Sequence, residues 1–408
     1  MPGPAPGDPL RMTPFERRAT ASLAGVFALR MLGLFIVLPV LALYAEELPG
    51  GRDPALAGLA LGAYALSQAV LQLPFGWASD RYGRKPPIVF GLVVFAAGSF
   101  ASAWAPTIEW LIAGRTLQGA GAVSAAVVAL AADLTRDSVR TRAMAAIGMT
   151  IGAAFALSLV AGPALAGVIG VPGLFVLTGV LAAGAIALVR YAVPEPPAHA
   201  AATPGGGPAN RVLLDPQLLR LDLGIFALHA ILMAMFVQVP FALRDGGLAP
   251  ARHWIVYLPV LVASVVVILP FLRGLDRRGR GKAALNTSIV ALATSLAILA
   301  AAGTSITGIV LGLFVFFAAF NLLEASLPAM VSRFAPPSAR GTAIGVFSTA
   351  QFLGTFAGAA VGGLLLKHFG PVAVYAFGIV FAAVWLVAGA TMAEPPSASQ
   401  STLSMGRT

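Results

Sequence analysis

Long apolar stretches alternate with short polar stretches along the whole chain. An α-helix needs about 20 mainly apolar residues to cross the hydrocarbon core of a bilayer. Twelve stretches reach this length and predict membrane-spanning helices: 20–44, 55–78, 86–105, 107–133, 140–168, 172–193, 216–243, 252–272, 282–301, 304–333, 340–367 and 371–393. The longest should tilt or extend beyond the hydrocarbon. The pattern therefore predicts an all-α integral membrane fold with twelve transmembrane helices.

The chain is expected to consist of two related halves. A polar stretch rich in Pro and Gly, at 194–215, has no apolar periodicity and predicts a cytoplasmic linker. The sequence DRYGR at 80–84 recurs as DRRGR at 276–280, and GPALAG at 162–167 recurs as GAAVGG at 358–363. We therefore predict two pseudo-symmetric six-helix bundles, 20–193 and 216–393, between short tails at 1–19 and 394–408. A substrate path is expected at their interface.

The basic residues predict the orientation in the membrane. Of the 26 Lys and Arg residues, 20 lie in or beside the two tails and the loops near 79–86, 134–142, 190–215, 273–282 and 333–340. The opposite loops hold four, namely Arg52, Arg244, Arg252 and Lys367. Cytoplasmic loops carry an excess of Lys and Arg. Both termini should therefore be cytoplasmic, in a multi-pass protein of the plasma membrane, the inner membrane of a bacterial cell.

Composition excludes several classes of protein. The chain is 58% hydrophobic and 10% charged, against about 25% charged in typical soluble domains. A soluble enzyme, a nucleic-acid binder and a disordered scaffold are therefore excluded. The chain has no Cys and four widely separated His residues, so disulfides are excluded and neither a metal site nor a cofactor is expected. Without a phosphate-binding Gly-Lys loop, ATP-driven pumping is not expected either.

The loop after the second predicted helix has a distinctive sequence, GWASDRYGRKPPI at 76–88. Its Gly76 would allow close helix contact and its Gly83 a tight turn. The loop also contains Asp80, Arg81, Arg84 and Lys85, and its weaker copy in the second half contains Asp276, Gly279 and Arg280. This stretch resembles the loop 2–3 signature of the major facilitator superfamily, apart from Ala78 where Leu is usual.

Arg115 lies deep within the fourth predicted helix, in LIAGRTLQGAG at 111–121. A guanidinium at this depth costs roughly 2.5–3.5 kcal/mol on insertion scales, so it should face a wet cavity or a partner. The segment resembles the helix 4 motif of the superfamily's drug–proton antiporters, where this Arg is assigned to proton coupling. The alternative is a structural Arg bonded to helix carbonyls.

Gly162, Pro163 and Gly167, on the fifth predicted helix, partly resemble a second antiporter motif. Ser158 and Ala166 replace glycines of that motif. We expect tight packing of the fifth helix on the eighth. The alternative is a kinked helix without influence on the direction of transport.

Taken together, the chain resembles the twelve-helix drug–proton antiporter branch, and within it the YajR-type group without its extra C-terminal soluble domain. The resemblance implies a latch in which Asp80 pairs with Arg84 and with Asp133 at the end of the fourth helix. Asp80 would also face the positive N-terminal end of the eleventh helix, near 338–342. Such a latch would favour the outward-facing state.

Polar residues within the apolar stretches are functional candidates by default. They are Arg30, Gln68, Gln72, Arg115, His229, Gln238, Asn321 and Glu324. Glu324 is the only carboxylate well inside a predicted span, and we expect it to carry a coupled proton, with His229 second. Alternatively, Glu324 is a fixed partner of Arg333, and His229 is an inert core residue. Aromatic residues that could line an apolar pocket are Phe35, Tyr64, Phe226, Phe236, Tyr257 and Phe320.

Three functions remain to be compared. The first is a proton-coupled exporter of small amphipathic molecules that works by alternating access. The second is a uniporter or symporter of a polar or anionic metabolite with the same fold. The third, a multispanning enzyme, lacks a catalytic cluster in the sequence and is not expected. The expected partners are a small-molecule substrate and membrane lipid, without nucleic acid, and the chain should act as a monomer.

Overall fold

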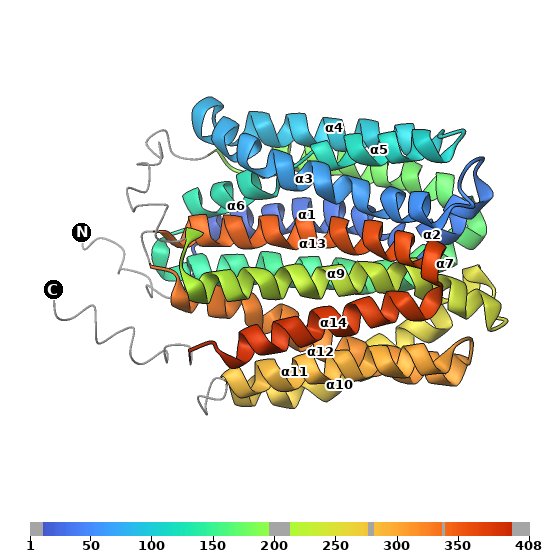
Figure 1. Cartoon of the computed structure of the whole chain (residues 1–408). Helices are drawn as coiled ribbons and strands as arrows, with labels where there is room; N and C mark the ends of the chain where they lie inside the picture. Colours follow the sequence, from blue (N-terminus) through green and yellow to red (C-terminus); the bar gives the residue numbers. More distant parts are fainter. Residues whose placement is uncertain (1–10, 196–212, 276–280, 337–338, 394–408) are drawn as a thin grey trace, which may run out of the picture.

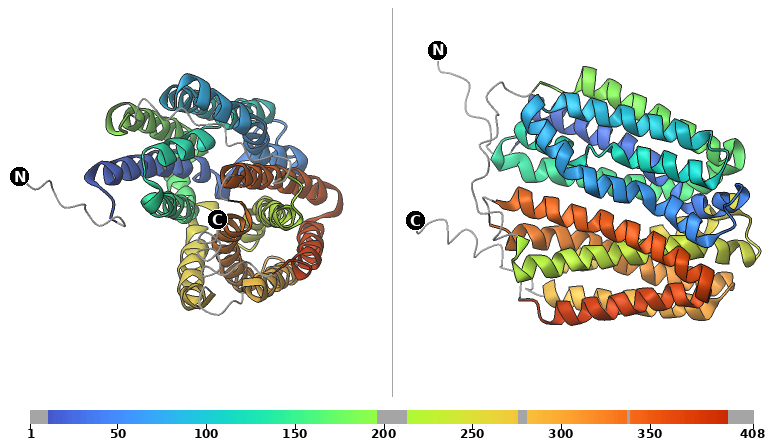
Figure 2. Two further views of the ribbon diagram at one scale, coloured as in Figure 1. Left: turned by 90° about the vertical axis from the view of Figure 1, so that its left-hand side faces the viewer. Right: turned by 45° about the horizontal axis from the view of Figure 1, so that its top comes forward.

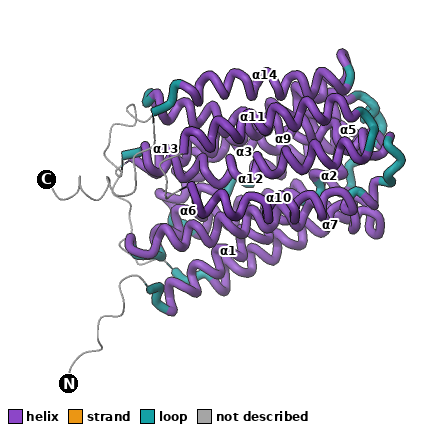
Figure 3. The backbone as a smooth tube through the Cα atoms, turned by 90° about the horizontal axis from the view of Figure 1, so that it is seen from below, coloured by secondary structure: helices purple, strands orange, loops and turns teal. Residues whose placement is uncertain are grey.

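The computed structural model describes residues 11–195, 213–275, 281–336 and 339–393 (Figure 1). Every regular element in these ranges is a helix, and the helices run alongside one another with short loops at both ends of the bundle (Figure 3). Eleven helical segments of the described residues are long and apolar enough to cross a membrane. The all-α membrane fold expected from the sequence is therefore confirmed.

The first half of the chain contains α1 (Pro14–Phe35), α2 (Leu38–Glu47), α3 (Pro54–Tyr82), α4 (Lys85–Ala103), α5 (Ile108–Ala120), α6 (Ser124–Asp133), α7 (Asp137–Ala187) and the π-helical turn η1 (Leu188–Ala192). The second half contains α9 (Pro216–Asp245), the 3-10 turn η2 (Pro250–Arg252), α10 (Trp254–Leu275), α11 (Gly281–Ala302), α12 (Ile306–Phe334), α13 (Arg340–Phe369) and α14 (Pro371–Ala390). Helices of the same half pack mainly on one another, and the two groups lie side by side (Figure 2).

The 51-residue α7 contains two of the predicted helices. Gly170 interrupts it with a φ of 69°, a conformation open to glycine because it has no Cβ. Arg136, just before α7, binds Glu16 near the start of α1, and Arg18 in the same region donates a hydrogen bond to Ala192 at the end of η1. Both ends of α7–η1 therefore lie at the same end of the bundle. The chain reverses at Gly170, so the eleven segments make twelve crossings.

Two predicted helices are interrupted within the bundle. The first breaks between α1 and α2, before Pro39, and the fourth breaks between α5 and α6 at 121–123. Irregular backbone at membrane depth is tolerated where protein buries it. The carbonyl oxygen of Gly121 accepts a hydrogen bond from Nη2 of Arg30 (3.2 Å), and a Cβ on Gly121 would lie 2.3 Å from the carbonyl oxygen of Gly91. Glycine therefore lets α4 approach the break closely.

We call the end of the bundle that holds Pro14 and Ala390 the terminal end, and the opposite end the distal end. At the distal end the two halves meet closely through α3 and α13. A Cβ on Gly58 would lie 2.3 Å from the carbonyl oxygen of Ala359, and one on Gly363 would lie 2.4 Å from that of Pro54. Glycines on both helices thus bring the two backbones into direct contact.

Two ion pairs also join the halves at the distal end. Glu46 at the end of α2 binds Arg244 at the end of α9, with 2.5 Å between Oε2 and Nη1. Asp53, the N-cap residue of α3, binds Lys367 near the end of α13, with 2.6 Å between Oδ2 and Nζ. The hydrogen bond from Lys367 lowers the pKa of the Asp53 carboxyl. The distal end is therefore closed by both backbone packing and charge.

The terminal parts of the same helices are much more exposed. Leu73 and Trp77 on α3 are 69% and 59% exposed. A Cβ added to Gly341 on α13 would meet nothing within 4 Å, and the same holds for Gly148 and Gly152 on α7. The tight contact between α3 and α13 is therefore confined to their distal parts.

Candidate functional site

A cluster of phenylalanine rings joins the two halves in the interior of the bundle. Phe155 of α7 contacts Phe35 of α1, with 5.3 Å between ring centroids. It also contacts Phe236 of α9 at 6.4 Å and Phe320 of α12 at 6.2 Å. The cluster therefore draws rings from both halves and gives their interface an apolar, polarizable surface.

A polar group borders this cluster on the side of the second half. The ring of His229 on α9 lies 6.0 Å from that of Phe320. Gln351 of α13 places its amide nitrogen 2.8 Å from Nε2 of His229 and 3.4 Å from Oε1 of Glu324 on α12. Oε2 of Glu324 lies 3.9 Å from Nε2 of His229 and is buried without a hydrogen-bond partner. The structure thus brings together the two residues that the sequence suggested for proton coupling.

The other polar candidates of the second half and the adjoining helices lie apart from this group. Asn321 of α12 donates to Ser264 of α10 (3.4 Å). The amide oxygens of Gln72 and Gln238 are buried without a partner. Gln238 lines a cavity of about 250 Å³ at the distal end, together with Glu46 and Arg244. Within the described ranges, no three side chains come together as metal ligands.

Arg30 is enclosed within the first half and is only 1% exposed. Its guanidinium donates to Gln68 of α3 (2.9 Å) and to Ser124 of α6 (3.1 Å), in addition to Gly121. It also lies over the ring of Phe95, 5.4 Å from the centroid. Arg30 therefore supports the broken fourth helix, and in this structure it is enclosed by protein.

Arg115 is likewise 1% exposed and satisfied within the first half. Its Nε donates to the carbonyl oxygen of Ala60 (3.3 Å), its Nη1 donates to Gln118, and its guanidinium lies 4.5 Å from the centroid of Tyr64. Gln118 in turn donates to Ser99 (2.9 Å). In this structure Arg115 has the structural environment that the sequence left open as the alternative.

The loop signature forms a charged cluster at the terminal end. Arg84 donates to Asp80, to Ser79 (3.3 Å) and through Nε to Asp133 (2.6 Å). Burial alone would lower the pKa of the Arg84 guanidinium, but its bonds to Asp133 and Asp80 raise it above the ordinary value. The three residues named for the latch are therefore in contact, and all belong to the first half.

Other residues of the loop signature have separate contacts. Gly83 ends α3 with a φ of 88°, as expected for a tight turn. A Cβ on Gly76 would lie 3.9 Å from Ala125, an ordinary contact, so the expected need for glycine at 76 is not met here. Arg81 lies over the ring of Trp77 (5.6 Å), and Lys85 donates to the carbonyl oxygen of Val193 (2.7 Å). The copy with Asp276, Gly279 and Arg280 lies outside the described residues.

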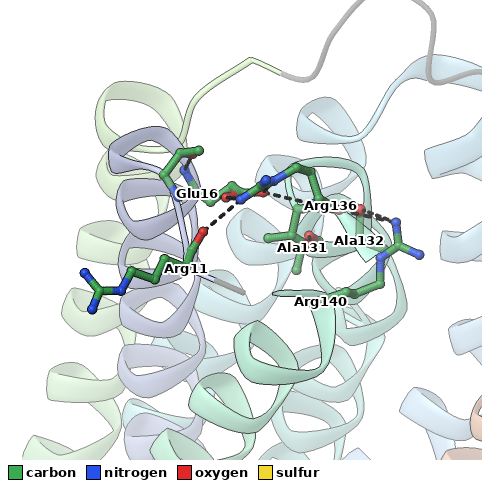
Figure 4. A network of polar contacts seen from close by, with 8 residues as sticks. Arg11, Glu16, Ala131, Ala132, Arg136 and Arg140 are labelled. Carbon is green, nitrogen blue, oxygen red and sulfur yellow. Dashed lines mark hydrogen bonds and ion pairs between the residues drawn. The ribbon is translucent and has the colours of Figure 1, made fainter. Parts of the chain in front are cut away.

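A second charged group holds the turn between α6 and α7 (Figure 4). Nε of Arg136 donates to Oε1 of Glu16 (2.8 Å), and Nη2 of Arg136 donates to Oε2 of Glu16 (3.0 Å) and to the carbonyl oxygen of Arg11 (2.9 Å). Arg140 donates to the carbonyl oxygen of Ala132 (3.2 Å). Because Asp133 ends α6 directly before this turn, these bonds help to position the acceptor of Arg84.

The glycines of the fifth predicted helix pack against two different neighbours. A Cβ on Gly162 would lie 2.3 Å from the carbonyl oxygen of Ile36, at the break between α1 and α2. Pro163 beside it is buried within α7. A Cβ on Gly167 would lie 2.8 Å from Ala251 of η2, just before the eighth helix. Gly162 therefore serves contact with the broken first helix, and Gly167 approaches η2 beside the eighth helix, on which α7 also packs.

Several residues of these sites were missed from the sequence. Gln351 is a polar side chain within an apolar stretch, the same feature that identified the other candidates, so it could have been found. Phe155 has no distinguishing feature in the sequence apart from being aromatic. Glu16 completes a capping box with Thr13, a pattern that the sequence displays. No local pattern in the sequence indicated the ion pairs between the halves, because the partners are 198 and 314 positions apart.

Comparison with known proteins agrees with this architecture. The family model described as the Major Facilitator Superfamily matches residues 23–249 and 247–406. The inner membrane transport protein YajR of Escherichia coli is 44% identical over 392 residues, covering 95% of this chain and 86% of YajR. The multidrug resistance protein MdtH of Aeromonas hydrophila is 26% identical over 346 residues, covering 82% of this chain and 84% of MdtH.

Solved structures show the same fold at low sequence identity. The crystal structure of a D-xylose–proton symporter matches with a TM-score of 0.74 and 17% identity, covering 94% of this chain and 98% of that protein. The family match over nearly the whole chain, the identity to YajR and the twelve-crossing helical bundle lead to one conclusion: this chain belongs to the Major Facilitator Superfamily and is a multi-pass membrane transporter.

Proposed function

We propose that the chain is a proton-coupled antiporter that exports small amphipathic molecules by alternating access. The observation that carries this proposal is the pair of Glu324 and His229, 3.9 Å apart, beside the aromatic cluster of Phe155. This proton acceptor lies next to an apolar surface at the interface of the halves. It can bind a proton there, and a substrate bound on the apolar surface can affect that binding. The likeness to MdtH, whose name describes multidrug resistance, supports export.

We further propose that the terminal end is cytoplasmic and that the membrane is the bacterial inner membrane. The excess of Lys and Arg at the terminal end supports this orientation, and YajR is named as an inner membrane protein. With the distal end closed, the structure would then correspond to an inward-facing arrangement. The contacts of Arg84 with Asp80 and Asp133 are formed in this arrangement, so these contacts by themselves do not select the outward-facing state. The rocking of two six-helix halves about a central site would expose the opposite face.

Transport of an anionic metabolite is the second candidate, because Arg30 and Arg115 could have offered positive charge to a substrate. In the structure both residues are 1% exposed, and their side chains are hydrogen-bonded within the first half. The proposal of antiport therefore relies on Glu324 and His229. It takes protons as the coupling ion, and it includes no cofactor and a monomeric chain.

The test uses proteoliposomes with an imposed pH gradient and a pH-sensitive dye. A panel of amphipathic cations, sugars and organic anions is added in turn. At least one amphipathic compound should dissipate the gradient with the wild-type chain and with Glu47→Gln, a matched control at an exposed position near the distal end. Glu324→Gln should abolish this proton movement because it removes the proposed proton acceptor.

The alternatives give different results. Proton movement that persists in Glu324→Gln would place the proton carrier elsewhere. A compound that equilibrates across the membrane without moving protons would refute antiport and indicate a uniporter.

A further inference from the structure

Gln351 links the two proposed proton acceptors, and its hydrogen bonds define where protons can lie. Its amide nitrogen is 3.4 Å from Oε1 of Glu324, an oxygen that accepts a hydrogen bond from it. Because an ionised carboxylate oxygen can only accept a hydrogen bond, the group of Gln351 that faces Oε1 of Glu324 is its NH₂ group and not its amide oxygen. The same nitrogen lies 2.8 Å from Nε2 of His229.

It follows that Nε2 of His229 accepts a hydrogen bond from Gln351. The ring proton must then be on Nδ1, which lies 3.2 Å from the carbonyl oxygen of Ile225 and can donate to it. All three contacts are satisfied by one arrangement, a neutral imidazole with its proton on Nδ1. A second proton on Nε2 would place two donors face to face at 2.8 Å.

The same geometry leaves one free acceptor in the group. Oε2 of Glu324 is buried and has no hydrogen-bond partner. A proton on Oε2 keeps every existing hydrogen bond, because Oε1 still accepts from Gln351. Among the described side chains on the helices packed against α9, Glu324 is the charged group within 4 Å of the His229 ring. Gln351 is its other polar side-chain neighbour, and the ring of Phe320 lies 6.0 Å away between centroids.

We propose that Gln351 is a positioning residue that selects the site of the coupled proton: it blocks Nε2 of His229 and leaves Oε2 of Glu324 to bind the proton. This inference rests on the proposed proton coupling and deepens it. His229, Gln351 and Glu324 lie on α9, α13 and α12 of the same half, so the group should keep its arrangement as the halves rock.

The test compares the wild-type chain with Gln351→Leu, which removes the amide at similar volume. Thr349→Val is the matched control, because Thr349 is on the same helix and its hydroxyl bonds only to Gly345 of that helix (3.0 Å). Proton-coupled exchange is measured against pH in proteoliposomes. The wild type and the control should show one titration step, and Gln351→Leu should show two, because His229 becomes able to bind a proton. The second step should disappear in Gln351→Leu combined with His229→Gln.

Nitrogen-15 NMR of histidine-labelled protein provides a readout that does not require transport. The His229 signal, identified by its loss in His229→Gln, should show the Nδ1-protonated neutral ring in the wild type and a protonated ring in acidified Gln351→Leu. A wild-type His229 that takes up a proton over the range of the exchange titration, or superimposable pH profiles for wild type and Gln351→Leu, would overturn the inference. Absence of proton movement in the wild type would instead refute the proposed function, and the NMR result would still decide the role of Gln351.

Discussion

Replacing Gly58 by alanine should shift the protein away from the arrangement that is closed at the distal end. The new Cβ would lie 2.3 Å from the carbonyl oxygen of Ala359 and 3.0 Å from Cα of Gly363. Both neighbours are backbone atoms of α13, so neither can rotate away and the two helices must separate. Overpacking of this kind typically costs about 1–3 kcal/mol. Since the cost falls on the closed arrangement alone, the ratio of closed to open molecules should fall roughly 5- to 150-fold.

The absence of native cysteine makes this shift measurable with two spin labels. Arg52 and Ala249 are exposed, lie at the distal end and belong to different halves, so each can be replaced by a cysteine that carries a spin label. Double electron–electron resonance then reports the distance distribution between the halves. Gly58→Ala should add a population at longer distance.

Gly148→Ala is the matched control, because a Cβ there meets nothing within 4 Å and the gain in helix propensity is the same. Its distance distribution should equal that of the unsubstituted labelled chain. An unchanged distribution in Gly58→Ala, in a protein that remains folded, would refute the argument that glycine packing holds the distal end closed.

Three further predictions concern charge and packing. Because Lys367 lowers the pKa of Asp53, their ion pair should stabilise distal closure fully above the ordinary carboxyl pKa, and this contribution should be lost as the pH falls through the lowered pKa. The same resonance experiment should therefore show a longer distance between the halves in acid. The effect should be at most about 1 kcal/mol for this half-exposed pair, and Asp53→Asn should show no change with pH. Gly121→Ala should lower stability by about 1–3 kcal/mol in detergent unfolding, because its Cβ meets a backbone oxygen. Asp80→Asn removes one acceptor of Arg84 and should slow exchange by up to about fivefold, and full activity would refute the latch.

Much of the fold follows from local properties of the sequence. Apolar stretches of sufficient length predicted the crossings, and the polar stretch near residue 194 separated the two groups of helices. The structure corrected details that depend on neighbours, such as the breaks at Ile36 and Gly121. Apolar composition continues through both breaks, so hydropathy alone could not show them.

The candidate site was predicted less completely. An ionisable residue in an apolar stretch is conspicuous, which explains why Glu324 and His229 were recognised. Arg30 and Arg115 were recognised by the same rule, but the structure gives them partners inside the first half. The rule detects a polar residue that needs a partner and does not tell whether the partner is a substrate or the protein.

The sequence by itself determined that this protein lies in a membrane, how many times it crosses and which orientation is expected, because these properties depend on the local balance of apolar and charged residues. Only the tertiary structure decided that Gln351 stands between His229 and Glu324, that Gly162 contacts the broken first helix, and that two ion pairs join the halves at the distal end. Each of these contacts joins residues distant in sequence. Their pairing is set by how the helices pack, and the pattern along one helix does not contain that information.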